Sequence, residues 1–191
     1  MKFILATQNK GKVAELCKIL SGDEIVTMGE AGFTEEIIED GNSFEENALI
    51  KARAVCKKMG VAAIADDSGL EVYALDMRPG IYSARYAGEN ATDEDRVLKL
   101  LSELSGKEDR RGRFVCAAAV CFPDGREEVC RGVVEGVMME RAMGDGGFGY
   151  DPIFKPDGFD KTMSQMTSAE KNAISHRAIA FNKLKEILQG M

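Results

Sequence analysis

Two consecutive carboxylates follow a short apolar segment. Asp66 and Asp67 come directly after residues 61–65, which read as a brief strand, and Ser68 follows them. In open α/β sheets, ligands bind beyond the carboxyl ends of strands, where adjacent acids can hold Mg²⁺ or deprotonate water. Because successive strand residues point to opposite faces, we expect one acid to face a site and the other to be held by backbone donors or to cap the turn. An ordinary acidic turn is the alternative interpretation.

A polar segment near the N-terminus has the residue types that bind phosphate. It lies between a predicted strand over residues 3–6 and a helical pattern that starts at Val13, and it consists of Thr7, Gln8, Asn9, Lys10, Gly11 and Lys12. Backbone N–H groups at a helix start favour an anion, and these side chains add donors. The spacing is not that of a Walker A loop. A plain Asn or Thr helix cap with exposed lysines is the alternative.

A glycine-rich segment follows residue 143. It carries four glycines in six positions and ends in Phe148, Gly149, Tyr150 and Asp151. The glycines let the backbone fold tightly, and the two aromatic rings offer flat faces for a nucleobase. The pattern favours a ligand-binding loop over a simple turn.

Three further polar residues lie near the C-terminus. Lys171, His176 and Arg177 would not share a face of one continuous helix, at 100° per residue. If all three contact one ligand, the helix breaks between Asn172 and Ser175, and Ser175 becomes a new N-cap. Taken alone, His176 is as well explained as a buried structural histidine.

An acidic stretch precedes Gly41. It contains Glu35, Glu36, Glu39 and Asp40, any of which offers a second metal ligand, although charge alone favours a solvated face.

Hydrophobic periodicity indicates the elements that position these residues. Ser43 and Glu46 form a capping-box pattern before an apolar helical face that ends at Gly60. Thr92 can cap a second helix. Thr167 and Glu170 form another capping-box pattern before the C-terminal helical stretch. Residues 113–122 and 127–140 predict a long hairpin, and residues 153–154 one more short strand. Strands mixed with helices predict an α/β fold with a mixed sheet.

Composition excludes several classes of protein. The chain has 191 residues with 25 Lys and Arg against 32 Asp and Glu, a net charge of -7, which argues against a binder of nucleic-acid polymer. The longest apolar run, residues 115–122, is far too short for a membrane span, and the N-terminus lacks a secretory signal core. We therefore expect a cytoplasmic protein with a single domain over residues 1–191. The five cysteines lack a Cys-x-x-Cys pair and are interpreted as reduced core thiols.

Taken together, six segments resemble the inosine triphosphate pyrophosphatase family. They are Thr7-x-Asn9-x-x-Lys12, Phe44-x-Glu46-Asn47-Ala48, Ala65-Asp66-Asp67-Ser68-Gly69-Leu70, Pro79-Gly80-Ile81-Tyr82-Ser83-Ala84-Arg85-Tyr86, Phe148-Gly149-Tyr150-Asp151-Pro152 and Glu170-Lys171-x-Ala173-x-Ser175-His176-Arg177. Gln8 stands where many relatives have glycine. The resemblance implies an elongated mixed β-sheet flanked by helices, with two lobes and the active site in the cleft between them. It also implies a homodimer.

The activity implied by the resemblance is Mg²⁺-dependent cleavage of nonstandard purine nucleoside triphosphates such as ITP, dITP and XTP to a nucleoside monophosphate and pyrophosphate. Asp67 resembles the general base and a metal ligand, and Glu39 its metal partner, with Glu36 or Asp40 as alternatives. The expected triphosphate-binding residues are Thr7 to Lys12, Ser68 and Lys171. The expected base pocket consists of Phe148, Gly149, Tyr150, Asp151, His176 and Arg177.

Two other functions stay open on the sequence alone. One is a related pyrophosphatase that acts on modified pyrimidine nucleotides. The other is a catalytically idle nucleotide-binding module. The adjacent acids Asp66 and Asp67 argue against the idle module, because binding a polyanion does not require two acids beside it.

Overall fold

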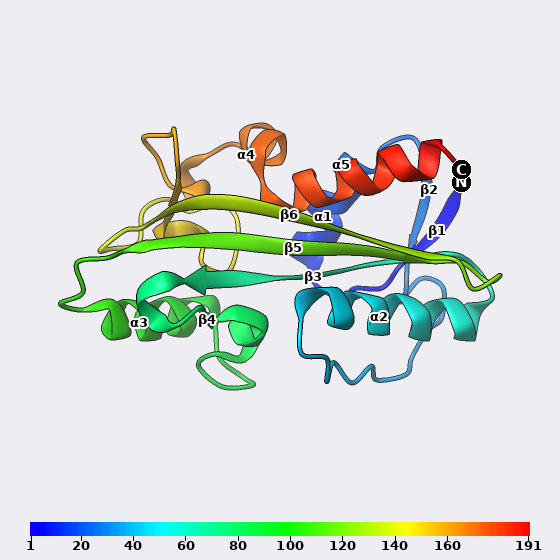
Figure 1. The fold of residues 1–191 in the computed structure, drawn as a ribbon, viewed down its shortest axis with the longest axis horizontal. Helices are drawn as coiled ribbons and strands as arrows, with labels where there is room; N and C mark the ends of the chain where they lie inside the picture. Colours follow the sequence, from blue (N-terminus) through cyan, green and yellow to red (C-terminus); the bar gives the residue numbers. More distant parts are fainter. The chain divides into compact units, whose positions relative to one another are not determined.

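The computed structural model describes all residues from 1 to 191, and they form two compact units. The first unit contains Met1–Asp67, Cys116–Gly132 and Arg177–Met191, and the second contains Ser68–Val115 and Val133–His176. The predicted α/β fold with a mixed sheet flanked by helices is confirmed (Figure 1). No helix combines the length and apolar character needed to span a membrane.

The sheet contains both parallel and antiparallel pairs. Its strands are β1 (Lys2–Leu5), β2 (Glu24–Thr27), β3 (Ala63–Val72), β4 (Arg78–Pro79), β5 (Arg111–Cys121), β6 (Glu127–Met138) and β7 (Phe154–Pro156), paired in the order β2-β1-β3-β5-β6-β7, with β4 on β3. In the first unit β1 is parallel to β2 and β3. In the second unit β4 is antiparallel to β3, and β7 to β6.

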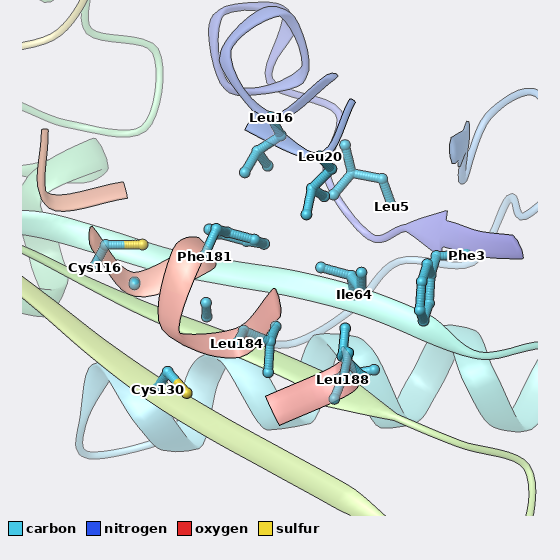
Figure 2. Packing of buried hydrophobic residues seen from close by; sticks show 13 residues of the cluster. Phe3, Leu5, Leu16, Leu20, Ile64, Cys116, Cys130, Phe181, Leu184 and Leu188 are labelled. Carbon is cyan, nitrogen blue, oxygen red and sulfur yellow. The ribbon is translucent and has the colours of Figure 1, made fainter. Parts of the chain in front are cut away.

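In the first unit, helices cover both faces of the sheet. Helix α1 (Lys10–Ile19) contributes Leu16, and Leu20 comes directly after it. Helix α5 (His176–Gln189) contributes Phe181, Leu184 and Leu188. These side chains pack against alternate strand residues, including Ile64 and Cys116 (Figure 2). The intervening strand residues face α2 (Phe44–Met59), where the Cys56 thiol lies beside Cys121 and the backbone of Ala63. The period-2 alternation of strand side chains therefore separates the two layers.

The predicted helix ends of the first unit are present, but the box predicted at Ser43 is incomplete, because Glu46 Oε2 accepts from the Asn42 N–H and not from the Ser43 N–H. Asn9 caps α1 by accepting a hydrogen bond from the Lys12 N–H, and Ser43 caps α2 through the Glu46 N–H. Gly60 ends α2 at a φ of 66°, a left-handed conformation that glycine adopts without steric cost.

The second unit has its own apolar core. Helix α3 (Asp93–Leu104) contributes Val97, Leu100 and Leu104, which pack with Phe114 and Phe154 of the strands. Thr92 and Asp95 form a capping box at the start of α3. Helix α4 (Ser168–Ile174) begins with the predicted box of Thr167 and Glu170. The predicted hairpin corresponds to β5 and β6, the long paired strands of Figure 1.

Three expectations need correction. The strand predicted to end before Asp66 continues as β3 through both acids to Val72. Strand β2 was not predicted at all. The cysteines are reduced as expected and four are buried, but Cys17 is exposed on α1 and is not a core thiol.

Candidate active site

The two acids of β3 lie where the neighbouring strand β1 ends. The last paired residue of β1, Leu5, stands opposite Ile64, and the Ala6 N–H still donates to the Ile64 carbonyl. Asp66 and Asp67 therefore extend beyond the carboxyl end of β1, beside the polar segment that leads into α1. The two acids were predicted to lie beyond the carboxyl end of their own strand. They lie inside β3 instead, beyond the carboxyl end of the neighbouring strand β1.

Asp66 lies on the α1 and α5 side of the sheet and is fully buried. Its Oδ2 atom accepts from Lys12 Nζ at 3.0 Å, and Arg177 Nε lies 3.3 Å away. The Arg177 guanidinium, 1% exposed, also donates to Glu15 of α1. The buried charges therefore form a network of two cations and two anions, and cations, not the expected backbone donors, hold Asp66.

Asp67 lies on the α2 side and meets a different lysine. Lys51 Nζ is 2.7 Å from Glu39 Oε1 and 3.7 Å from Asp67 Oδ1. The other carboxylate oxygen, Asp67 Oδ2, is buried and has no hydrogen-bond partner. Glu36 and Asp40 are exposed, so among the three candidate acids the structure brings Glu39 to Asp67.

The pKa values of the two acids shift in opposite directions. Burial would raise the pKa of Asp66, but the charges of Lys12, Arg177 and Lys51 outweigh it and hold that pKa well below its usual value. Burial raises the pKa of Asp67, and the nearby carboxylates add to the rise while the lysines oppose it. Asp66 thus stays ionised, whereas Asp67 is the more basic carboxylate. Such a divergence is typical of acids with separate roles in catalysis.

The cluster of Glu39 and Asp67 fits a magnesium ion. No group of three or more His, Cys, Asp or Glu side chains gathers as a metal site. Mg²⁺ characteristically takes only one or two protein carboxylates and completes its shell with water and substrate phosphates. Two neighbouring carboxylates, one with an unpartnered buried oxygen, match that requirement.

The N-terminal segment forms the start of α1 and its cap. The Asn9 N–H donates to Thr7 Oγ1 at 3.2 Å, and Asn9 in turn caps α1. Gln8, Asn9 and Lys10 are exposed, whereas the side chain of Lys12 is only 15% exposed and contacts Asp66. The structure therefore shows the predicted Asn cap, and phosphate binding by this loop stays a prediction.

In the second unit, the glycine-rich loop is fixed by carboxylates. Asp151 Oδ2 accepts from the Phe148 N–H at 3.0 Å and from Lys171 Nζ at 2.6 Å. A Cβ atom on Gly147, whose φ is 70°, would lie 2.2 Å from the same carboxylate. The Lys171 ammonium also lies 4.6 Å from the centroid of the Phe148 ring. Lys171, expected with the phosphates, thus contacts residues expected in the base pocket.

The aromatic residues of the second unit differ in exposure. Phe148 is partly exposed, whereas Tyr150 is buried in the core and donates from its hydroxyl to the Ser83 carbonyl at 2.8 Å. Burial raises the pKa of Tyr150. The ring of His176 is buried and stacks on Phe114, with centroids 4.7 Å apart.

The predicted break in the C-terminal helix is confirmed. Helix α4 ends at Ile174, Ser175 is extended, and α5 begins at His176. Lys171 and His176 belong to the second unit, and Arg177 to the first. Ser68, partly exposed on β3, belongs to the second unit.

Two charged residues of this site were missed from the sequence. Lys51 is buried on α2 in line with Asn47, on the face formed by Phe44, Ala48 and Val55. A lysine on an apolar helical face was the available signal. Glu15 carried no comparable signal, because its partner Arg177 is 162 residues away in the chain.

The fold and these residues define an α/β protein whose paired acids and lysines suit a phosphorylated ligand. The chain belongs to the Ham1 family, whose model matches residues 3–187, and this confirms the predicted family. It is 52% identical to the dITP/XTP pyrophosphatase of Bacillus subtilis over 190 residues, 97% of this chain and 96% of the relative. It is 43% identical to the Staphylococcus aureus dITP/XTP pyrophosphatase over 189 residues, 99% of this chain and 97% of the relative.

Solved structures agree with this assignment. The Staphylococcus aureus Ham1 protein has a TM-score of 0.91 at 43% identity, with 100% of this chain and 99% of that chain covered. A HAM1 protein from Coxiella burnetii also has a TM-score of 0.91, at 39% identity, with both chains covered fully.

Proposed function

We propose that this chain hydrolyses nonstandard purine nucleoside triphosphates, namely ITP, dITP and XTP, to the nucleoside monophosphate and pyrophosphate. The observation that carries the proposal is the arrangement of two adjacent carboxylates on opposite faces of β3. Asp66 lies 3.0 Å from Lys12, and Asp67 lies 3.7 Å from Lys51, which also contacts Glu39 at 2.7 Å. Two relatives of this chain are dITP/XTP pyrophosphatases, and their names support the choice of substrate.

The first unit carries the phosphate chemistry in this proposal. Asp67 accepts a proton from the attacking water, and its raised pKa suits that task. Lys12 and the N–H groups at the start of α1 bind phosphate oxygens. Lys12 exchanges its contact with Asp66 for the phosphate, and Arg177 keeps Asp66 paired when it does.

Glu39 and Asp67 would hold the magnesium ion. When bound, Mg²⁺ would neutralise and polarise the phosphate oxygens of the substrate. Lys51 contacts both carboxylates and keeps them close together, so it orders the ligand pair before the ion arrives. Chelation of divalent cations is expected to abolish hydrolysis, and Mg²⁺ to restore it.

The second unit carries the recognition of the base. Phe148 offers a partly exposed ring, and Lys171 and Asp151 fix its loop. Hypoxanthine and xanthine present an acceptor oxygen at the purine 6-position, where adenine presents an amino donor. Backbone N–H donors of the second unit would pair with the oxygen and stay unpaired against adenine. Each buried unpaired donor costs about 1 to 3 kcal/mol, so a few contacts reject ATP.

One assay tests the proposal against its alternatives. The protein is offered ITP, XTP, GTP, ATP, dUTP and dTTP with Mg²⁺, and the released phosphate species is identified. We expect pyrophosphate from ITP and XTP in excess over the rest. Release of orthophosphate, a preference for pyrimidines, or binding without turnover would each overturn the proposal.

The proposal includes a cytoplasmic homodimer. Sedimentation of the purified protein at several concentrations tests the dimer, and a purely monomeric species would contradict it.

A further inference from the structure

Asp93 of α3 holds the backbone of the glycine-rich loop. Thr92 and Asp95 make the capping box of α3, so the helix cap leaves the Asp93 carboxylate for other contacts. Its Oδ2 atom accepts a hydrogen bond from the Gly149 N–H at 2.9 Å, across 56 residues of sequence. Helix and loop both belong to the second unit. Asp93 is thus a long-range contact to the loop, outside the residues that line the proposed base site.

The second oxygen of Asp93 is also held. Oδ1 lies 2.6 Å from Arg96 Nη1, and Arg96 Nε donates to the Ala84 carbonyl at 2.6 Å. Ala84 belongs to the 3-10 helix Gly80–Arg85. The Arg96 side chain is only 17% exposed. Arg96 therefore orients the carboxylate toward Gly149 and ties it to a second element.

Two carboxylates fix the conformation of Phe148. The Phe148 N–H donates to Asp151, and the Gly149 N–H, on the other side of the Phe148 Cα atom, donates to Asp93. Because these two N–H groups flank the two rotatable backbone bonds of Phe148, holding both fixes φ and ψ there. The backbone conformation sets the direction of the Cα–Cβ bond of Phe148 and limits the rotamers that its ring can adopt. The start of the loop is held separately, because the Gly146 N–H donates to the Ser164 carbonyl and the Ser164 hydroxyl donates to the Gly146 carbonyl. At Gly149, beyond Phe148, the contact is with Asp93.

We propose that Asp93 is a positioning residue for recognition of the substrate base, acting through the backbone of Phe148 and touching no substrate atom. The inference rests on the proposed function. Without the contact, the loop samples more conformations, and base binding then includes the entropic cost of ordering it. The cost falls on the base-dependent part of the affinity and leaves phosphate binding and chemistry unchanged.

The variant Asp93→Ala tests this, with Glu94→Ala as the matched control. Glu94 is an exposed carboxylate in the same first turn of α3 and does not contact the loop. We expect Asp93→Ala to raise the KM for ITP about tenfold, because the variant loses one hydrogen bond to a charged group. The kcat should change less than about twofold. The Ki of inorganic tripolyphosphate, a competitor that has no base, should stay at the wild-type value. Asp93→Asn keeps an acceptor and should restore part of the affinity.

A second measurement does not depend on turnover. Amide hydrogen exchange of the segment 145–151 should accelerate in Asp93→Ala and not in Glu94→Ala. A wild-type KM and wild-type exchange in Asp93→Ala would overturn the inference, as would an equal rise in the KM for ITP and the Ki for tripolyphosphate. If the wild-type protein does not release pyrophosphate from ITP, the proposed function is wrong, whereas faster exchange in Asp93→Ala would still establish the backbone contact.

Discussion

Asp66 and Asp67 are consecutive residues of β3 whose carboxylates meet different lysines on opposite faces of the sheet. Lys12 Nζ lies 3.0 Å from Asp66, and Lys51 Nζ lies 3.7 Å from Asp67. Strand geometry imposes this division, because neighbouring side chains point to opposite faces. One sequence pair thereby supplies a carboxylate whose pKa is lowered by neighbouring cations and a carboxylate whose pKa is raised by burial.

The two acids should respond differently to the same substitution. Asp67→Asn should keep the fold and substrate binding and lose most of its turnover, because an amide cannot accept the proton of the attacking water. Asp66→Asn should lower the free energy of unfolding by about 3 to 5 kcal/mol, because Lys12 and Arg177 lose a buried counter-ion. Denaturant unfolding and steady-state kinetics separate the two effects. Near-normal turnover in Asp67→Asn would remove Asp67 from the base role.

Lys51 should control the pH dependence of hydrolysis. Asp67 must be ionised to act as a base, so activity falls on the acid side as the pH drops through its pKa. The positive charge of Lys51 lowers that pKa, against the larger effect of burial. In Lys51→Met the pKa therefore rises, and the acid limb of the residual kcat/KM profile should move upward by about one pH unit. Lys58→Met, which removes an exposed lysine of the same helix, is the control. An acid limb that stays in place would contradict the assignment of Asp67.

The sequence predicted the features that depend on neighbouring residues. The cap at Thr92, the capping box at Thr167, the Ser43 half of the predicted box and the left-handed end at Gly60 follow from contacts within a few residues. The helix break before His176 was expected only on the condition that Lys171, His176 and Arg177 contact one ligand; the structure shows the break, and the shared ligand stays a prediction.

Features that depend on distant charges were not predictable from the sequence. Two aspartates favour a turn over a strand interior, so β3 was expected to end before Asp66. The buried cations Lys12 and Arg177 compensate Asp66 within the strand, and their distances of 3.0 and 3.3 Å are properties of the fold. The position of Lys51 on an apolar helical face indicated a buried charge, but its partners Glu39 and Asp67 come together only in three dimensions.

Among the cysteines, only Cys17 should react readily with thiol reagents. Cys17 is exposed on α1, and the other four cysteines are buried. Burial, together with a hydrogen bond to Cys121, raises the pKa of Cys56 to about 11, and burial also raises the pKa of Cys116 and Cys130. Iodoacetamide at neutral pH should label one thiol in the native protein and five after denaturation, because the thiolate is the reactive form. Cys17→Ser should remove the native label, and labelling that persists in this variant would contradict the expectation.

At Met77, glycine should give a more stable protein than alanine. Its φ is 66°, in the left-handed region that non-glycine residues occupy at a cost of about 1 to 2 kcal/mol. Met77→Gly and Met77→Ala both remove the side chain, but only glycine relieves the backbone. We therefore expect Met77→Gly to unfold at higher denaturant concentration than Met77→Ala, by about 1 kcal/mol in free energy of unfolding. Leu98, exposed in α3, supplies the control: there the alanine variant should be the more stable by about 1 kcal/mol. A Met77→Ala variant more stable than Met77→Gly would show that the Met77 backbone is not strained.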